Sequence, residues 1–174
     1  IETIGELEYA CKENRLVDLP GFGKKTQENI QKGISHIRTT AGQYLLHEAG
    51  TMAYDILQQL EKCPGIHTLS IAGSLRRSKE IIKDIDILAS SNEVENVMDF
   101  FVSLPGVADV TGQGPTKTSV HLRGGIAVDL RVVSPKQFPY ALHHFTGSKE
   151  HNTKMRHIAK SLGLKMNESG LFRE

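Results

Sequence analysis

Hydrophobic residues in the first third of the chain recur at helical spacing. Ile30, Ile34 and Ile37, for example, fall on one face of a helix, and a longer apolar face follows the same period before Pro64-Gly65. The pattern Thr3…Glu6 is typical of a capping box at a helix start. We therefore predict helices over three ranges: from about 3 to 14, 24 to 38 and 43 to 62.

After Pro64-Gly65 the pattern changes to short apolar runs bounded by turn residues, which is typical of strands. Arg123-Gly124-Gly125 indicates a hairpin between two of them. The predicted strands are 66–73, 85–88, 119–122 and 126–133, with a helix at 92–103 and a final stretch, 135–174, that is helical in two pieces broken at 146–148. This order predicts an α+β protein of three lobes: a helical lobe at 1–62, a lobe with a small mixed sheet at 63–134 and a helical tail at 135–174.

The composition narrows the class of protein. The chain has 174 residues, and no run of about 18 apolar residues exists, which excludes a membrane span. Lys plus Arg number 21 and Asp plus Glu 20, so any attraction to nucleic acid must come from local patches. The two cysteines, Cys11 and Cys63, exclude a disulfide scaffold and a Cys-rich zinc site and fit a reducing compartment. Because the first residue is Ile1, we expect a piece of a longer or processed chain.

Acidic residues are concentrated on two of the predicted strands. Side chains alternate along a strand, so Asp84 and Asp86 share one face, roughly 6.5–7 Å apart at Cα. Asp129 and Arg131 likewise share the polar face of the strand 126–133. If these strands are neighbours, three carboxylates converge. Such a cluster is costly unless cations neutralise it, and Mg²⁺ prefers oxygen ligands. For a lone Asp-x-Asp, solvated side chains on a half-buried sheet remain the alternative.

A glycine-serine turn precedes the acidic pair. Gly73 permits close backbone approach, and Ser74 with free N–H groups at a helix start can hold a phosphate. Arg76 and Arg77 add positive charge. A strand-to-helix turn with a solvated basic surface is the alternative for this segment alone. Its combination with the acidic pair and a third carboxylate supplies the parts needed to transfer a nucleotidyl group.

The segment Gly73-Ser74-Leu75-Arg76-Arg77…Asp84-Ile85-Asp86 resembles the signature of the nucleotidyltransferase superfamily. The segments Val128-Asp129-Leu130-Arg131 and Phe145-Thr146-Gly147-Ser148…Asn152…Met155-Arg156 resemble the family X DNA polymerases, the relatives of polymerase beta. Leu19-Pro20-Gly21-Phe22-Gly23-Lys24-Lys25-Thr26 is similar to their bacterial and archaeal branch. The resemblance covers essentially the whole chain and implies helical fingers with a helix-hairpin-helix, a nucleotidyltransferase palm and a partial thumb.

The resemblance also implies a role for individual residues. Asp84, Asp86 and Asp129 would be the catalytic carboxylates, the first two binding two Mg²⁺ or Mn²⁺ ions and the third only the catalytic ion. It further implies a cis peptide in the Thr-Gly-Ser turn, at Gly147-Ser148. The residues implied at the nucleotide are Gly73, Ser74, Arg77, His144, Phe145, Gly147 and Asn152.

The sequence departs from its relatives at three places. His144 stands where many relatives have Tyr, Ala127 where polymerase beta has Arg, and Lys83 where polymerase beta has Gly.

Two surfaces are expected to contact DNA. The glycine hairpin Gly21-Phe22-Gly23 would offer backbone N–H groups to a phosphate, with a monovalent cation at its carbonyls, although a tight interhelical turn is an equal alternative for this segment alone. The stretch 149–165 carries five Lys or Arg against one Glu, and a solvated face is its alternative. The histidines show no firm zinc-ligand spacing. The residues expected at DNA are Gly21, Gly23, Lys24, Lys25, Thr26, Arg131, Lys154 and Arg156.

The pattern as a whole predicts a monomeric, template-directed, gap-filling DNA polymerase module in the cytoplasm of a bacterial or archaeal cell. Its partners would be gapped or primer–template DNA and a dNTP. Two alternatives are a nucleotidyltransferase acting on a non-DNA substrate and a non-catalytic DNA-end-binding module. As a further hypothesis, Arg131 would pair with Asp86 or Asp84 until metal and nucleotide arrive.

Overall fold

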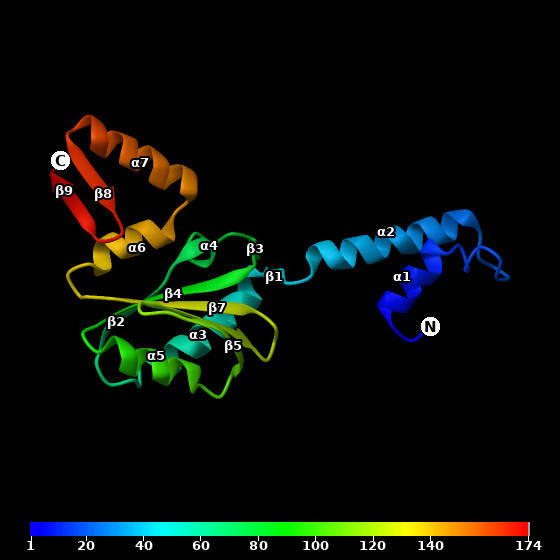
Figure 1. Cartoon of the computed structure of the whole chain (residues 1–174), viewed down its shortest axis with the longest axis horizontal. Helices are drawn as coiled ribbons and strands as arrows, with labels where there is room; N and C mark the ends of the chain where they lie inside the picture. The colour runs from blue at the N-terminus through cyan, green and yellow to red at the C-terminus, as the bar shows by residue number, and fades with distance from the viewer. Residues whose placement is uncertain (174) are drawn as a thin grey trace. The chain divides into compact units, whose positions relative to one another are not determined.

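The structure, a computed structural model, describes residues 1–173, except for the side chains of residues 36 and 38–40. It divides into two compact units, Ile1–Gly42 and Gln43–Glu174, each with its own packing (Figure 1). No helix in the part of the chain that the structure describes is both long and apolar enough to cross a bilayer.

The first unit consists of two helices and the turn between them. Helix α1 spans Ile4–Lys12 and helix α2 spans Lys24–Thr40. The Thr3 hydroxyl accepts a hydrogen bond from the Glu6 N–H at 3.1 Å, as the capping pattern predicted. A small apolar cluster of Ala10, Cys11 and Leu16, joined by Leu7 and Ile30, holds the two helices together.

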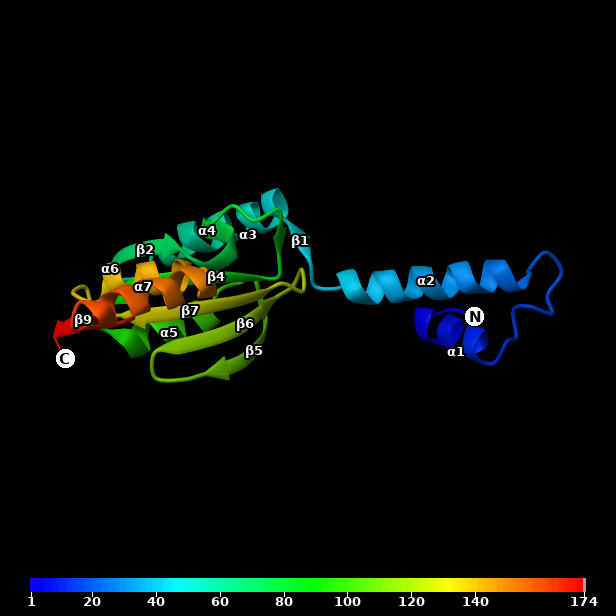
Figure 2. The same cartoon turned by 90° about the horizontal axis from the view of Figure 1, so that it is seen from above.

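The second unit is built on a five-stranded mixed sheet of order β2-β4-β7-β6-β5 (Figure 2). Strands β4 and β7 at its centre are parallel, and the other neighbouring pairs are antiparallel. The hairpin predicted at Arg123-Gly124-Gly125 joins β6 to β7. The strands span Ile66–Ile71 (β2), Asp84–Ser91 (β4), Val107–Gln113 (β5), Lys117–Leu122 (β6) and Ala127–Val133 (β7).

Helices cover the sheet, and the unit also contains two short two-stranded pairs. The helices are α3 (Leu46–Leu60), α4 (Gly73–Arg76), α5 (Val94–Val102), α6 (Phe138–Thr146) and α7 (Lys149–Ser161). Strands β1 (Tyr44–Leu45) and β3 (Ile81–Ile82) pair with each other, and β8 (Leu164–Asn167) pairs with β9 (Gly170–Arg173).

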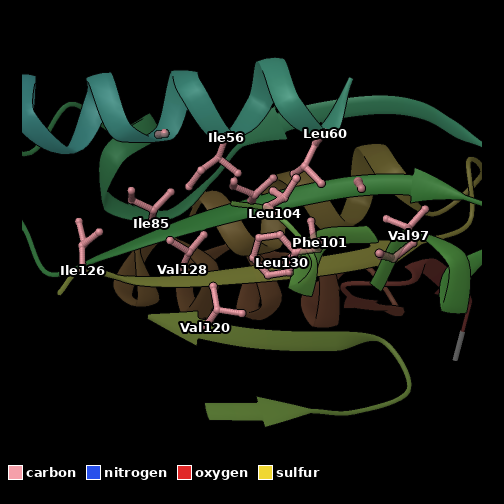
Figure 3. Packing of buried hydrophobic residues seen from close by; sticks show 14 of the residues in the cluster. Ile56, Leu60, Ile85, Val97, Phe101, Leu104, Val120, Ile126, Val128 and Leu130 are labelled. Carbon is pink, nitrogen blue, oxygen red and sulfur yellow. The ribbon is translucent and has the colours of Figure 1, made fainter. Parts of the chain in front are cut away.

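The main core lies between one face of the sheet and helices α3 and α5. Ile56 and Leu60 of α3 point toward the strands, and Phe101 of α5 is fully buried beside Leu130 of β7 (Figure 3). At about 25 cal/mol per Å² of apolar surface, each such large side chain contributes roughly 1.5–3 kcal/mol to folding. This packing fixes the strands of the sheet, whose opposite face carries the acidic residues.

Helix α3 belongs to the sheet and not to the helices before it. Its Ala49, Ala53, Ile56 and Leu60 are all in the main core, so the compact-unit boundary falls after Gly42, whereas the expected helical lobe extended to residue 62. A helical pattern shows which face is apolar but not which neighbour covers that face.

The end of the chain differs from the prediction of helix over 135–174. After α7, Gly163 adopts φ +68° and the chain forms the hairpin β8–β9. The Asn167 side chain accepts hydrogen bonds from the Ser169 and Gly170 N–H groups at 2.9 and 3.1 Å, which closes the turn. Strand β5 was also not predicted, because it is an edge strand with two register shifts and mostly exposed side chains.

Candidate active site

The acidic residues predicted to converge lie in one row across the sheet. Asp86 of β4 is the register partner of Asp129 of β7, and Asp129 is the partner of Ser119 of β6. Residues paired in this way point to the same face, and Asp84 follows on that face by the strand period. The two strands are neighbours, as the convergence required, so the three carboxylates lie on one face of adjacent strands.

Asp129 is held by two residues that the sequence analysis did not single out. The Ser119 hydroxyl donates a hydrogen bond to Asp129 Oδ1 at 2.6 Å, and Lys117 Nζ lies 2.6 Å from Oδ2. The signal was present, because a hairpin centred on Gly124 places residues 119 and 129 opposite each other.

The clustering of the three carboxylates changes the pKa of Asp86. Its pKa is raised from 3.8 to about 6, first by burial and then by the charges of Asp84 and Asp129, while Arg131 and Lys117 act in the opposite direction. A bound cation would relieve this repulsion, which is the condition expected of a metal-binding carboxylate cluster.

Arg131 does not pair with the acidic cluster, so the hypothesis of an ion pair with Asp86 or Asp84 is wrong for this structure. Its guanidinium stands over the Phe145 ring, 4.3 Å from the centroid, and none of the ion pairs among the described residues includes it. In the register, Arg131 lies beside Leu88 and not beside Asp86. The guanidinium therefore stacks on an aromatic ring of α6, although its charge still lowers the pKa of Asp86.

The glycine-serine turn closes against the acidic cluster. Gly73 begins the single turn of α4 with φ +57°, and the Ala72 N–H donates to the Asp86 carbonyl at 2.8 Å. Ser74 lies on this turn. Arg77 follows this turn, and its Nη1 donates a hydrogen bond to the Thr146 carbonyl. This bond connects the glycine-serine turn to the end of α6.

The turn between α6 and α7 has the geometry that the resemblance implied. The Gly147–Ser148 peptide bond is cis, as predicted. Ser148 caps α7 by accepting a hydrogen bond from the His151 N–H at 3.4 Å. Asn152 is buried, and its Nδ2 donates to the His144 carbonyl at 2.6 Å. Among the described residues no donor reaches Asn152 Oδ1, which is therefore a buried acceptor without a hydrogen bond.

A pocket of about 450 Å³ unites these segments. Its wall contains nine of the ten residues predicted at metal or nucleotide, and only Asp129 is missing from that set. Arg131, predicted at DNA, is not on the wall either. Phe145 also lines a second cavity of about 510 Å³, together with Arg131. The wall of the first pocket consists of Gly73, Ser74, Arg77, Asp84, Asp86, His144, Phe145, Gly147, Ser148, Lys149, Asn152 and Arg156.

The side chains of Asp84, Asp86 and Asp129 suit a hard divalent cation, because all three offer carboxylate oxygens as ligands. Over residues 1–173, no three or more acidic, His or Cys side chains are gathered tightly enough to enclose one ion. One carboxylate oxygen of Asp129 is occupied by the Lys117 ammonium. Lys117 thus provides the positive charge that a cation would otherwise supply.

Apart from Arg131, which is half-buried against Phe145, the residues predicted to contact DNA lie on exposed surfaces. In the first unit, Gly21 adopts φ +87° and Gly23 precedes α2, whose first turn presents Lys24, Lys25 and Thr26 to solvent and contains no acidic residue. In the second unit, Lys154 and Arg156 are exposed on α7.

Comparison with known proteins gives the relationship. The chain is 38% identical over 167 residues to the DNA polymerase/3'-5' exonuclease PolX of Bacillus subtilis, covering 95% of this chain and 29% of that protein. The family model of the DNA polymerase beta thumb matches residues 141–174. These matches support a family X DNA polymerase.

Three further comparisons agree with this relationship. The repair DNA polymerase X of African swine fever virus is 26% identical over 133 residues, which are 73% of this chain and 76% of the viral protein. Two structures of Leishmania infantum polymerase beta, a ternary P/T complex and a ternary gap complex, share the fold. Both have a TM-score of 0.67 and cover 99% of this chain, with 23% and 24% identity and 70% and 62% of their own length. The chain spans under a third of the Bacillus relative.

Proposed function

We propose that this chain is the polymerase module of a family X enzyme and that it adds a dNMP from a dNTP to a primer 3′ end in gapped DNA. The observation that carries the proposal is the register of β4 and β7, which sets Asp86 opposite Asp129 next to the pocket that contains Ser74 and Arg77. A carboxylate cluster beside a phosphate-binding turn is the arrangement that nucleotidyl transfer requires.

Asp84 and Asp86 would hold both of two Mg²⁺ or Mn²⁺ ions, and Asp129 the catalytic one. Bound ions supply the charge that stabilises in-line phosphoryl displacement and lowers the pKa of an attacking hydroxyl. Ser119 orients the Asp129 carboxylate, and Lys117 must release it when a cation arrives.

The nucleotide is held from two sides of the 450 Å³ pocket. Ser74 and Arg77 contact the phosphates, and the bond from Arg77 to the Thr146 carbonyl sets the distance between the two turns. His144 and Phe145 lie beside the sugar. Asn152 reaches the base, since it lines the same pocket.

DNA is bound without sequence preference and as a monomer. The exposed first turn of α2, with Lys24, Lys25 and Thr26 after the Gly21–Gly23 hairpin, takes a backbone phosphate, with a monovalent cation at the hairpin carbonyls. Lys154 and Arg156 contact the template strand from α7. Because these contacts neutralise phosphates, binding weakens steeply with salt.

Primer extension on gapped DNA with Mg²⁺ tests the proposal. Wild type should extend the primer, Asp129→Ala should reduce extension by about a hundredfold or more, and Asp109→Ala, an exposed acid on β5, should not change it. Equal activity of Asp129→Ala would remove the two-metal claim. Tight gap binding without extension by this chain or a longer one would favour a DNA-end-binding module, and transfer only to RNA, protein or a small molecule would favour the other nucleotidyltransferase.

A further inference from the structure

Two histidines outside the acidic cluster face each other across the turn between α6 and α7. His143 Nε2 lies 3.3 Å from His151 Nε2, and the ring centroids are 5.4 Å apart with the planes inclined at 51°. The residues are eight positions apart, so no spacing on one helix predicts their contact. The turn at 146–148 brings the last turn of α6 against the first turn of α7.

The distance between the two nitrogens fits a shared metal ion. Zinc binds imidazole nitrogen at about 2.0–2.1 Å in tetrahedral geometry, which places two such nitrogens about 3.3–3.4 Å from each other. The same 3.3 Å is at the long end for a hydrogen bond, since N–H···O bonds span about 2.7–3.2 Å. The pair is thus at the separation of two ligands of one cation.

The protonation state of His143 is the one that binds metal ions. The pKa of His143 is lowered, first by burial and then by His151 and His144, so its imidazole is neutral at physiological pH. A neutral imidazole with Nε2 aimed at a second imidazole is the form that ligates.

We propose that His143 and His151 form a two-histidine site for Zn²⁺ or a similar transition-metal cation, bridging the end of α6 and the start of α7. The donors are nitrogens, which suit Zn²⁺, Ni²⁺ or Cu²⁺, whereas the carboxylates of the sheet suit Mg²⁺ or Mn²⁺. His151 is exposed and His143 half-buried, so water completes the coordination. The site is therefore chemically distinct from the acidic cluster and does not depend on the proposed polymerase activity.

The site adds a second cross-link between helices that are already joined once. Asn152 Nδ2 donates to the His144 carbonyl, one residue further along each helix than the histidine pair. Gly147 and Ser148, between the two helices, line the nucleotide pocket. A cation on the histidine pair would fix the angle between α6 and α7 at one wall of that pocket.

Zinc titration of the whole chain tests the site. Isothermal titration should show a Zn²⁺ site that His143→Ala and His151→Ala each weaken by about tenfold or more, since even the loss of an outer partner of a ligand costs about 10- to 100-fold. His157→Ala, an exposed histidine on the same helix, should leave the affinity unchanged. Unchanged affinity in both pair variants, or equal loss in His157→Ala, would overturn the proposal.

Side-chain NMR on wild type gives an answer that needs no variant to fold. With ¹⁵N-labelled protein, sub-stoichiometric Zn²⁺ should shift the Nε2 resonances of His143 and His151 before those of the other histidines. If neither resonance moves while Zn²⁺ binds at the carboxylates, the histidine pair is a hydrogen-bonded contact only and the proposal fails.

Discussion

Gly73 and Asp86 approach so closely that a Cβ atom placed on Gly73 would lie 1.9 Å from Asp86 Oδ2. Gly73 also has φ +57°, a conformation that costs other residues about 1–2 kcal/mol. Two separate features therefore require glycine at position 73: its backbone conformation and the Asp86 carboxylate packed against it.

Gly73→Ala should displace the Asp86 carboxylate and lower the free energy of unfolding by about 1–3 kcal/mol. Urea unfolding monitored by circular dichroism measures this loss. Gly50→Ala is the matched control, because Gly50 lies inside α3 with open space at its Cβ position, and it should stabilise by roughly 0.5–1 kcal/mol. A Gly73→Ala protein as stable as wild type would contradict the close approach.

Asp86→Asn should stabilise the protein at pH 7.5 in the absence of divalent cations. Because the pKa of Asp86 is raised from 3.8 to about 6, the native state binds more protons than the unfolded state between those values, and stability falls as pH rises through that window. At one pKa unit per about 1.4 kcal/mol, the gain from removing the charge is about 1–3 kcal/mol.

The same substitution should have little effect at pH 4, where the Asp86 carboxyl of the native protein is already neutral. Urea unfolding at pH 4 and pH 7.5 gives both values. Asp109→Asn, on the exposed edge strand, should change stability by less than about 0.5 kcal/mol at either pH. Destabilisation by Asp86→Asn at pH 7.5 would show that the charge is compensated in the native state.

Lys117→Met should tighten Mn²⁺ binding several-fold, because the ammonium 2.6 Å from Asp129 Oδ2 competes with a cation for that oxygen. Electron paramagnetic resonance of free Mn²⁺ during titration measures the affinity. Lys136→Met, exposed and outside the cluster, serves as control and should bind as wild type does. Weaker Mn²⁺ binding by Lys117→Met would mean that Lys117 positions Asp129 and does not compete.

The contact between Arg131 and Phe145 should appear as a coupling energy. In a double-mutant cycle of Arg131→Met and Phe145→Leu, the two changes should be non-additive by about 0.5–2 kcal/mol in unfolding free energy. Additive effects would show that the guanidinium does not stay over the ring in solution.

Helices and strands could be predicted from the sequence where one of their faces is buried, because burial makes apolar residues recur at a regular spacing. Alternation in 126–133 and the hairpin at 123–125 predicted β6 and β7, and the helical period predicted α2, α3 and α5. Strand β5 was not predicted, because an exposed edge strand needs no alternation of apolar and polar residues. Strands β8 and β9 were not predicted, because four residues are too few to show a periodic pattern. Neither omission affects the acidic row.

The sequence by itself determined which residues share a face: strand alternation placed Asp84 with Asp86 and Asp129 with Arg131, and family resemblance predicted the cis peptide at Gly147–Ser148. Only the tertiary structure decided what each side chain meets there. The register between strands places Lys117 and Ser119 next to Asp129. The packing of α6 places Phe145 under the Arg131 guanidinium, and the turn between α6 and α7 places His143 next to His151. These contacts join residues from different elements, and a periodic pattern carries information about one element at a time.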